Sequence, residues 1–432
     1  MDVRLAGPRI EGGEKIFTPD ELIRHLDARL APADQELAVR YPEDRGVRQP
    51  VHTVYVPADR YDAGTVPAWG RQARAVLEEH SGGPAVFADV LDLPPALAEE
   101  VYARVYAKLG AEPIEDLRID FEDGYGTRSE EGEDAAVKAA AQALTRSLND
   151  AVAAPFHGIR FKSFEAPTRA RGVRTLHRFV GVLAAAGGLG EGFVLTLPKV
   201  TSVDQVEAMA VACAAVEGAH GLGPGSLRFE IQVETPQSVL GSDGTVLVAR
   251  MIHAADGRCS GLHYGTYDYS ASCGIAAAHQ SMEHPAADHA KAVMQVAAAG
   301  TGVFLSDGST NVLPVGDRDA VHAGWRLHAR LVRRSLERGF YQGWDLHPAQ
   351  LPSRFAATYA FYREGLPGAA ARLRAYLRGG DSGFLDEPAT ATALAGFVLR
   401  GVECGAVDES EVERLVDADR TRLSVLARRQ RS

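Results

Sequence analysis

Short apolar segments and longer amphipathic segments alternate along most of the chain, beginning near residue 51. The run FEIQVETP (229–236) shows the short type most clearly, because its apolar residues alternate with Glu230, Gln232 and Glu234. A strand places every second side chain on one face, and a proline such as Pro236 ends it. The pattern predicts strands in the runs VHTVYVPAD (51–59), DLRIDFEDG (116–124), HGIRFKSF (157–164), GFVLTLPKV (192–200), LRFEIQVET (227–235), CSGLHYGTYDYS (259–270), GVFLSDGST (302–310) and FYQGWDLHP (340–348).

Helix-compatible segments separate most of these strands, as in EDAAVKAAAQALTRSLND and DRDAVHAGWRLHARLVRRSLERG. Alternation of strands and helices implies parallel strands joined by helical crossovers. The run PAVFADVLDL reads as a further strand, but we treat residues 84–112 as an insertion, which leaves eight strands. Eight strands predict an α/β fold of the TIM (β/α)8 barrel type. A doubly wound sheet is the alternative, weakened by the absence of a G-x-G-x-x-G run between a strand and a helix.

The flanks of the chain differ from this middle part. We expect residues 1–48 to form an N-terminal extension, in which TPDELIRHLDARL starts a helix with a Thr cap and Pro at the first position, followed by a polar loop. Residues 49–355 form the predicted barrel, and residues 356–432 a helical C-terminal segment with a Gly-rich loop. No internal repeat or low-complexity tract interrupts this organisation.

Composition narrows the function classes. The 432 residues are 46% hydrophobic with a net charge of -11, so a general nucleic-acid binder is not expected. The four cysteines form no C-x-x-C pair, which speaks against a disulfide framework or a zinc site. Because the sequence shows no signal-peptide pattern and no apolar run long enough to cross a bilayer, we expect a cytoplasmic protein.

Polar residues recur at the C-terminal end of the predicted strands. In a TIM barrel these ends open onto one face, where such enzymes work. Taken alone, each residue is best explained as a solvent-facing or helix-capping side chain. The recurrence of such residues at strand ends, however, indicates a functional site. The set comprises Asp120, Glu122 and Asp123, then Arg160 and Lys162, Lys199, Glu234, Asp268, Asp307, Asp345 and His347.

Glu234 and Asp268 are the pair of greatest interest, because each follows an apolar strand and precedes small or turn residues. Two carboxylates from successive strands can hold Mg²⁺, a hard cation that takes oxygen ligands and keeps several waters. Such a metal polarises a carbonyl and stabilises an enolate. The alternative is an ion pair with Arg160 or Lys199.

The runs RIDFEDGYG, GIRFKSF, TLPKV, IQVETPQSVLG, HYGTYDYSASCG and GFYQGWDLHPAQL occur in this order. Together they resemble the HpcH/HpaI aldolase and citrate lyase β-subunit superfamily, which includes malyl-CoA lyases and, more distantly, malate synthases. The resemblance covers roughly residues 51–355. It implies an oligomeric TIM-barrel enzyme that depends on Mg²⁺, or on Mn²⁺, and makes or breaks a carbon–carbon bond next to a carbonyl. The implied substrate is a small carboxylic acid or its CoA thioester.

The resemblance also implies roles for single residues. Glu234 and Asp268 match the metal ligands, and Arg160 matches the group that neutralises an enolate or keto-acid oxygen. Glu122 and Asp123 match a D-x-E-D turn that orients metal-bound water. Two further positions belong to the implied substrate pocket: Pro57, in the first-strand V-P turn, and Lys162, which stands where the superfamily has Asn. His347 and Gln350 match a segment whose residues have a structural rather than a catalytic role.

Two features depart from the superfamily: the insertion at residues 84–112 and the long histidine-bearing loop AAAHQSMEHPAADHAK. The tail run DSGFLDEPATATALAG loosely resembles a segment that relatives fold over a neighbouring subunit's site, so Asp381 or Asp386 is a candidate carboxylate there. A helix N-cap by Asp386 explains the same run equally well. His279, His284 and His289 are spaced at intervals of five and are expected on the surface.

The hypothesis that follows is a Mg²⁺-dependent carbon–carbon lyase or aldolase acting on a 2-hydroxy or 2-keto acid. The base is a metal-bound water, a nearby carboxylate or a histidine such as His263. One alternative is a malate-synthase-like condensing enzyme with Asp381 or Asp386 as base. Another is a metal-binding barrel that serves as a non-catalytic subunit, since a fold does not define a function. A phosphoryl-transfer enzyme is disfavoured because no phosphate-binding Gly loop is present.

Overall fold

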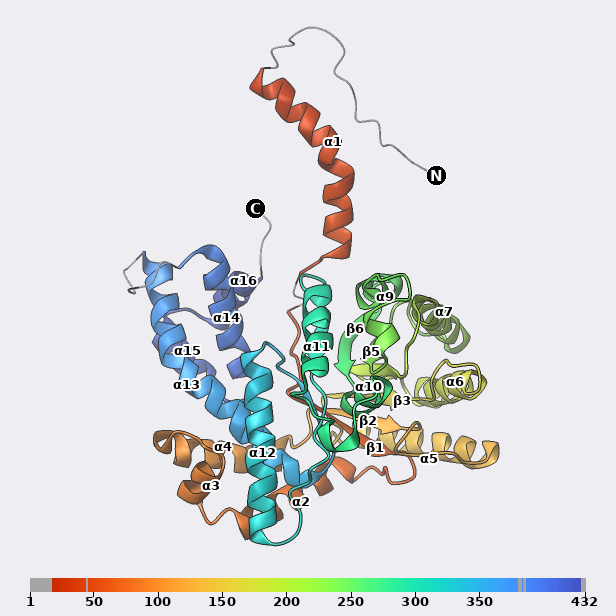
Figure 1. The fold of residues 1–432 in the computed structure, drawn as a ribbon, viewed down its shortest axis with the longest axis vertical. Helices are drawn as coiled ribbons and strands as arrows, with labels where there is room; N and C mark the ends of the chain where they lie inside the picture. Colours follow the sequence, from red (N-terminus) through yellow and green to blue (C-terminus); the bar gives the residue numbers. More distant parts are fainter. Residues whose placement is uncertain (1–17, 44–45, 380–382, 384–385, 429–432) are drawn as a thin grey trace. The chain divides into compact units, whose positions relative to one another are not determined.

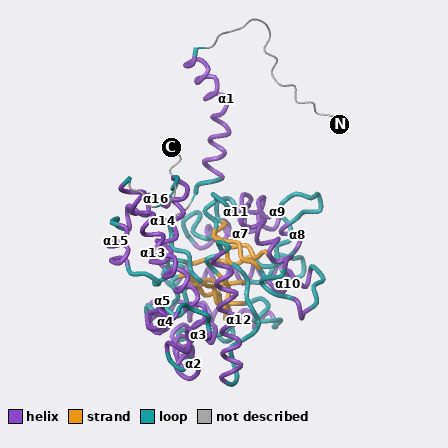
Figure 2. Tube along the Cα trace, turned by 60° about the vertical axis from the view of Figure 1, so that its left-hand side comes forward, coloured by secondary structure: helices purple, strands orange, loops and turns teal. Residues whose placement is uncertain are grey.

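The computed structural model describes residues 18–43, 46–379, 383 and 386–428. It divides into two compact units, Met1–Pro42 and Glu43–Ser432, which we describe separately. The larger unit contains every strand of the described chain (Figures 1 and 2).

Eight parallel strands form one sheet in the order β7-β6-β5-β4-β3-β2-β1-β8. A bridge between Ser306 and Gln342 and the hydrogen bond from Asp307 N to Gln342 O (2.9 Å) close the gap between the β7 and β8 edges. The expected TIM barrel is therefore confirmed. The strands are β1 (His52–Pro57), β2 (Asp116–Asp120), β3 (Phe156–Arg160), β4 (Phe193–Leu197), β5 (Phe229–Val233), β6 (Cys259–Tyr264), β7 (Phe304–Ser306) and β8 (Gly343–Asp345).

Helices surround the strands, with α5, α6, α7, α9 and α11 in sequence around one side of the barrel (Figure 1). Their apolar faces pack on the outward-facing strand residues Val54, Ile119, Ile159, Leu195 and Ile231. The helices of this layer are α5 (Glu130–Asn149), α6 (Arg169–Ala185), α7 (Val203–His220), α8 (Pro236–Val239), α9 (Leu247–Ala254), α10 (Thr266–Ser272), α11 (Pro285–Ala298) and α12 (Arg318–Glu337).

The inward-facing residues of the barrel are largely polar, whereas TIM barrels are usually filled with Val, Ile and Leu. Arg118 of β2 donates to Thr196 of β4 (3.1 Å) and Glu230 of β5 (2.9 Å). The hydroxyl of Tyr55 on β1 donates to Glu230 as well (3.4 Å). Strands that are not neighbours can touch only through the barrel interior, so these buried side chains fill it. Buried charges need such partners, because an unpaired one is costly to desolvate.

A second hydrophobic core lies between the insertion and the C-terminal segment. Helix α13 (Leu351–Arg378) packs against α12, α14 and α4, and buries Phe355 and Leu373. The run PAVFADVLDL, read as strand-like, forms helix α3 instead, because Phe87 and Val90 face this core at helical rather than alternate spacing. The other helices that contribute to this second core are α2 (Thr65–His80), α3 (Pro84–Val90), α4 (Ala98–Ala111), α14 (Pro388–Glu403), α15 (Glu409–Val416) and α16 (Arg420–Ala427).

The smaller unit contains helix α1 (Pro19–Arg40), which begins where the sequence predicts. Thr18 and Glu21 form a reciprocal capping box, which satisfies backbone donors at the helix start. The polar loop expected after residue 30 is wrong, because α1 continues past Pro32 to Arg40. In the described part of the chain, no helix is long and apolar enough to span a membrane.

Two of the strand-end carboxylates point away from the barrel mouth. Asp345 is fully buried and accepts from His52 (2.8 Å) and from Arg354 Nη2 (2.8 Å). Asp307 accepts from Lys291 Nζ (2.9 Å) and Ser335 Oγ (2.6 Å), so both carboxylates tie strands to the surrounding helices.

Substituting Asp345 tests this structural role. We expect Asp345→Asn to lower the free energy of unfolding by about 3–5 kcal/mol, because Arg354 then remains buried without a counter-charge. Asp59→Asn removes the exposed ion pair with Arg128 and serves as the control, with an expected change below about 1 kcal/mol. Urea unfolding followed by circular dichroism measures both, and equal effects would contradict the assignment.

Candidate functional site

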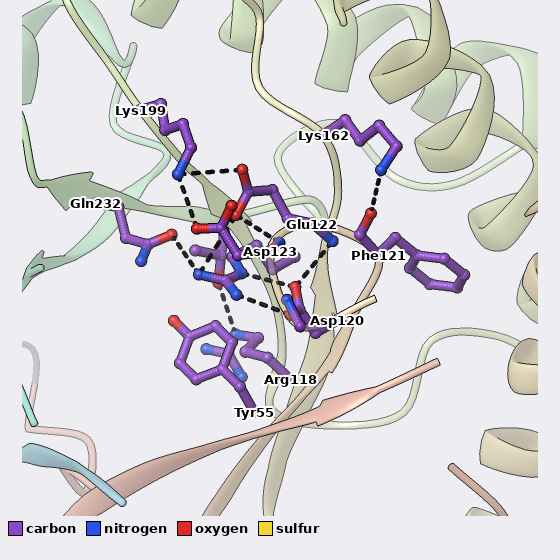
Figure 3. Close-up of polar contacts among 12 residues, drawn as sticks. Tyr55, Arg118, Asp120, Phe121, Glu122, Asp123, Lys162, Lys199 and Gln232 are labelled. Carbon is purple, nitrogen blue, oxygen red and sulfur yellow. Dashed lines mark hydrogen bonds and ion pairs between the residues drawn. The ribbon is translucent and has the colours of Figure 1, made fainter. Parts of the chain in front are cut away.

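Polar side chains from the ends of β2, β3, β4 and β5 converge at the C-terminal mouth of the barrel (Figure 3). We call Glu122, Asp123, Glu234 and Asp268 the carboxylate cluster. Lys199 and Arg160 lie beside it. Four of these six residues follow a strand directly in the chain or within three positions, so the parallel direction of the strands brings them together.

Glu234 follows the last residue of β5 and is 1% exposed. Its carboxylate accepts from the backbone N–H of Lys199 (2.7 Å) and from Gln232 Nε2 (3.2 Å). The neighbouring strand approaches so closely that a Cβ on Gly265 would lie 2.4 Å from the Glu234 Cβ, which requires glycine there. Burial raises the pKa of Glu234 to about 7, while Lys199 opposes the shift.

Lys199 connects the members of the cluster. Its ammonium lies 2.8 Å from Asp123, 3.2 Å from Glu122 and 3.5 Å from Asp268. The backbone of Lys199 is left-handed, with φ of 50°, a conformation that costs energy for a side chain with a Cβ. Burial lowers the pKa of Lys199, but Glu234 and Glu122 more than offset it, so the pKa lies above its ordinary value and the ammonium is charged.

Asp120 and Arg160 form a buried two-pronged ion pair. Arg160 Nε and Nη2 donate to the two Asp120 oxygens at 2.7 and 2.8 Å. The third nitrogen, Nη1, lies 3.4 Å from Gln232 Oε1 and 3.7 Å from Glu122. The guanidinium also stacks over the Tyr55 ring at 4.6 Å. These contacts leave Nη1 as the nitrogen that faces the carboxylate cluster.

The same Asp120 also shapes the turn after β2. Its oxygens accept from the backbone N–H groups of Glu122 (3.0 Å) and Gly124 (2.8 Å). Burial raises the pKa of Glu122 to about 7, although Arg160 and Lys199 pull it down. The pKa of Asp123 is lowered: burial opposes ionisation there, but the hydrogen bond from Lys199 prevails. The pKa values of two adjacent carboxyl groups are thus shifted in opposite directions, a property typical of acid–base sites.

Asp268 lies in the first turn of α10 and its side chain is 48% exposed. The ion pair with Lys199 that the sequence left open as an alternative is present in the structure. Four carboxylates around one ammonium nevertheless leave an excess of negative charge, which fits a hard divalent cation. Within the described ranges no three His, Cys, Asp or Glu side chains form a preformed metal cluster. Glu234 and Asp268 would therefore supply two ligands, and water or substrate the others.

Other candidate residues lie at the edge of the site or elsewhere. Lys162 donates to the backbone oxygens of Phe121 (2.9 Å) and Gly126 (3.0 Å), so it holds the turn after β2 (Figure 3). Pro57 ends β1 in register with Asp120. Their predicted roles in substrate binding stay predictions.

The histidine and the described tail carboxylate that were candidate bases, His263 and Asp386, do not belong to the carboxylate cluster. His263 lies inside the barrel, 2.9 Å from Glu230, a member of the interior network rather than of the cluster. Asp386 pairs with Arg372 in the helical segment, and the N-cap of α14 is Glu387, so the capping expected of Asp386 is wrong. Asp381 lies outside the described residues. His347 caps the turn at Pro348–Gln350, as its structural character implied.

The sequence placed Asp120 and Lys199 among the polar strand-end residues that indicate a site, but it gave Asp120 no specific role and Lys199 only that of a possible ion-pair partner. It did not single out Gln232 as a site residue. Asp120 and Gln232 occupy inward positions of apolar strands, two residues before or after other polar residues. That spacing of two is the signal that could have identified them, because inward-facing side chains alternate along a barrel strand.

One family model matches residues 30–431 and describes a domain of unknown function (DUF6986). No curated protein matches the chain. A citrate lyase structure from Burkholderia xenovorans LB400 is 16% identical, with 87% of this chain and 100% of that chain covered and a TM-score of 0.54. CitE from Mycobacterium tuberculosis, in complex with magnesium, acetoacetate and coenzyme A, is 18% identical with 83% and 99% covered and a TM-score of 0.48. Haloferax volcanii malate synthase at 3 mM glyoxylate is 16% identical with 73% and 76% covered and a TM-score of 0.47. The similarity to the citrate lyase structure, at 16% identity, establishes the fold alone, which agrees with the fold that the sequence motifs implied.

The opposite pKa shifts of Glu122 and Asp123 predict opposite effects on stability. The folded-state pKa of Glu122, about 7, exceeds its ordinary 4.5, so the free energy of unfolding falls as pH rises from about 4.5 to about 7. Glu122→Gln should remove this fall and be more stable than wild type at pH 8, by about 1–3 kcal/mol. Asp123 has a lowered pKa and stabilises the fold above pH 3.8, so Asp123→Asn should be less stable at pH 8.

Urea unfolding of both variants and wild type at pH 4.5, 6 and 8, in EDTA, measures these differences. Effects of the same sign at pH 8 would show that the two carboxyls do not titrate as the geometry implies.

Proposed function

The chain belongs to the family described as a domain of unknown function (DUF6986), and we propose that its barrel is a divalent-metal-dependent enzyme acting on a carbon–carbon bond. The substrate class is a 2-hydroxy or 2-keto acid, free or as a CoA thioester. One observation supports this most: a carboxylate cluster, an ammonium and a guanidinium meet at the C-terminal barrel mouth. This is the end of a TIM barrel at which catalysis takes place.

Arg160 is suited to hold the acidic part of the substrate. Its bidentate bond to Asp120 fixes the guanidinium plane, and Nη1 remains directed at the cluster. A fixed cation that needs no reorganisation stabilises an enolate oxygen better than a mobile one does. Lys199 offers a second positive charge to a substrate carboxylate.

Glu234 and Asp268 are the residues that would hold the metal. When bound there, a divalent cation supplies Lewis-acid polarisation of a substrate carbonyl or hydroxyl oxygen. Burial raises the pKa of Glu234 to about 7, and a cation bound beside this carboxylate would favour its ionised form. Mg²⁺ and Mn²⁺ both suit oxygen ligands of this kind.

Glu122 is the carboxylate best placed to move a proton. It is 8% exposed, its pKa is raised to about 7, and it lies between Arg160 and Lys199. A base titrating near neutral pH can take a proton from a hydroxyl or from a carbon next to a carbonyl and return it later. Asp123, held ionised by Lys199, keeps the ammonium in place beside it.

The fold likeness to a citrate lyase supports the proposed chemistry as an analogy. A condensing enzyme that joins a thioester to a keto acid or aldehyde uses a similar set of groups and is the second candidate. The homo-oligomer and the CoA thioester that the resemblance implies stay predictions.

A product-release assay tests the proposal. Purified protein is given a panel of 2-hydroxy and 2-keto acids and their CoA thioesters, each with Mg²⁺ and with EDTA. We expect metal-dependent release of pyruvate, glyoxylate or acetyl-CoA from at least one substrate. The double variant Glu234→Gln, Asp268→Asn and the variant Arg160→Gln should each lose about 100-fold or more in kcat/KM.

Release from free acids identifies an aldolase, and release from thioesters alone identifies a thioester lyase. Formation of a thioester-derived product without cleavage identifies the condensing enzyme. Full activity of the double variant in Mg²⁺ would reject the metal assignment, and inactivity on the whole panel in both directions would reject the enzyme.

The position of Lys199 predicts competition with the metal. Because its ammonium pairs with Asp268 and is attracted by Glu234, Lys199→Met should tighten Mg²⁺ binding about tenfold, a change of about 1.4 kcal/mol. Isothermal titration of metal-stripped protein measures this. Lys138→Met, which replaces an exposed lysine of α5, is the matched control. Unchanged or weaker binding in Lys199→Met would show that the ammonium and the metal do not share these carboxylates.

A further inference from the structure

A cavity of about 550 Å³ lies at the opposite end of the barrel, where the strands begin. Its rim includes the exposed residues Gly190 and Ser226, so it reaches the surface. None of the residues of the carboxylate cluster lines it. A volume of this size is typical of sites that hold small organic ligands.

The barrel leaves this space open because its lowest interior layer is incomplete. TIM barrels fill the interior with layers of side chains, but β6 contributes Gly261 at this level. The side walls are apolar and partly aromatic. They comprise Val47, Pro50, Phe156, Leu189, Phe193, Val194, Leu222 and Phe304.

The inner end of the cavity is polar, and its charged side chains have partners inside the barrel. Asp116 and Glu230 line it, and both pair with Arg118. Glu230 also contacts His263 Nε2 at 2.9 Å, and each of these four side chains is less than a tenth exposed. Arg118 offsets one of the two negative charges, and burial raises the pKa of Asp116, so this end of the cavity carries a weaker negative field than two free carboxylates would.

Arg228, on the lining of the cavity, has no carboxylate at ion-pair distance among the residues that the structure describes. It lies just before β5 and donates only to the backbone oxygens of Gly257 (3.2 Å) and Cys259 (3.4 Å) among described residues. Its Nε is buried without a hydrogen-bond partner, and burial lowers its pKa. A half-buried guanidinium without a carboxylate partner is costly, and an anion relieves that cost. Ser260 is another residue of the lining, and its buried Oγ has no hydrogen-bond partner among the described residues.

From this cavity we infer a second ligand site, at the N-terminal end of the barrel, for a small carboxylate with an apolar, preferably aromatic, body. The carboxylate binds Arg228, which presents donors in a fork that matches two carboxylate oxygens. The apolar body lies against the phenylalanine walls, where aromatic rings gain from edge-to-face packing.

The site is separate from the proposed catalytic centre. Tyr55 and Trp344, whose rings lie 4.2 Å apart, fill the part of the barrel that separates the cavity from the carboxylate cluster. The Arg118–Glu230 pair lies on the cavity side of these rings. Arg160 rests on the upper side of the Tyr55 ring. The inference therefore stands independently of the function proposed for the carboxylate cluster.

Indole-3-acetate is a suitable probe, because it joins an aromatic body to a carboxylate, and indole-3-acetamide is its neutral counterpart. Isothermal titration of the full chain should show binding of the acid and at least tenfold weaker binding of the amide. Arg228→Gln should abolish the preference for the acid. Ser226→Trp, at the exposed rim, should weaken both ligands at least tenfold by blocking the entrance.

Two matched variants locate the binding. Arg326→Gln, which replaces an exposed arginine of α12 outside the cavity, and Glu234→Gln, which alters the carboxylate cluster, should bind the acid with wild-type affinity. Equal preference for the acid in wild type and Arg228→Gln would overturn the inference. So would loss of binding in Glu234→Gln, or failure of wild type to bind indole-3-acetate, phenylacetate and octanoate at millimolar concentration.

Discussion

The buried ion pair between Asp120 and Arg160 is the interaction on which the site depends. The carboxylate of Asp120 accepts two hydrogen bonds from the Arg160 guanidinium and two from backbone N–H groups of the turn after β2. This one side chain therefore fixes both the orientation of the guanidinium and the position of the turn that carries Glu122 and Asp123. A buried pair of this kind is costly to break because either partner alone would be left uncompensated. The geometry of the site and the packing of β2 beside β3 are therefore linked energetically.

The polar filling of the barrel has a second consequence. An interior of Val, Ile and Leu would pack into continuous layers, whereas here charged side chains meet across the barrel through specific bonds. Above the Tyr55 and Trp344 rings the carboxylates are in excess, and below them Arg228 is a guanidinium that has no carboxylate partner among the described residues. One barrel thus presents two ends of opposite electrostatic character, each suited to a different kind of ligand.

Much of the fold follows from local pattern. The eight strands and the helices between them occur where the alternation of apolar residues places them, since outward-facing strand residues must meet the apolar face of a crossover helix. The two errors differ in cause: tertiary packing explains only the first, because α1 buries no residue. Residues 84–90 are apolar enough for a strand but are helical because they face the core around α13, and α1 continues through Pro32 where a loop was expected.

The sequence by itself determined the barrel and the level at which polar residues gather, because period and strand direction are local properties of the chain. It singled out Glu234, which faces the site, but it also grouped Asp307 and Asp345 with the polar strand-end residues, although these two bind Lys291 and Arg354. Only the tertiary structure decided this, because a one-residue difference at a strand end turns a side chain inward or outward. The same holds for the cavity beside Arg228, which exists because of what distant segments leave unfilled.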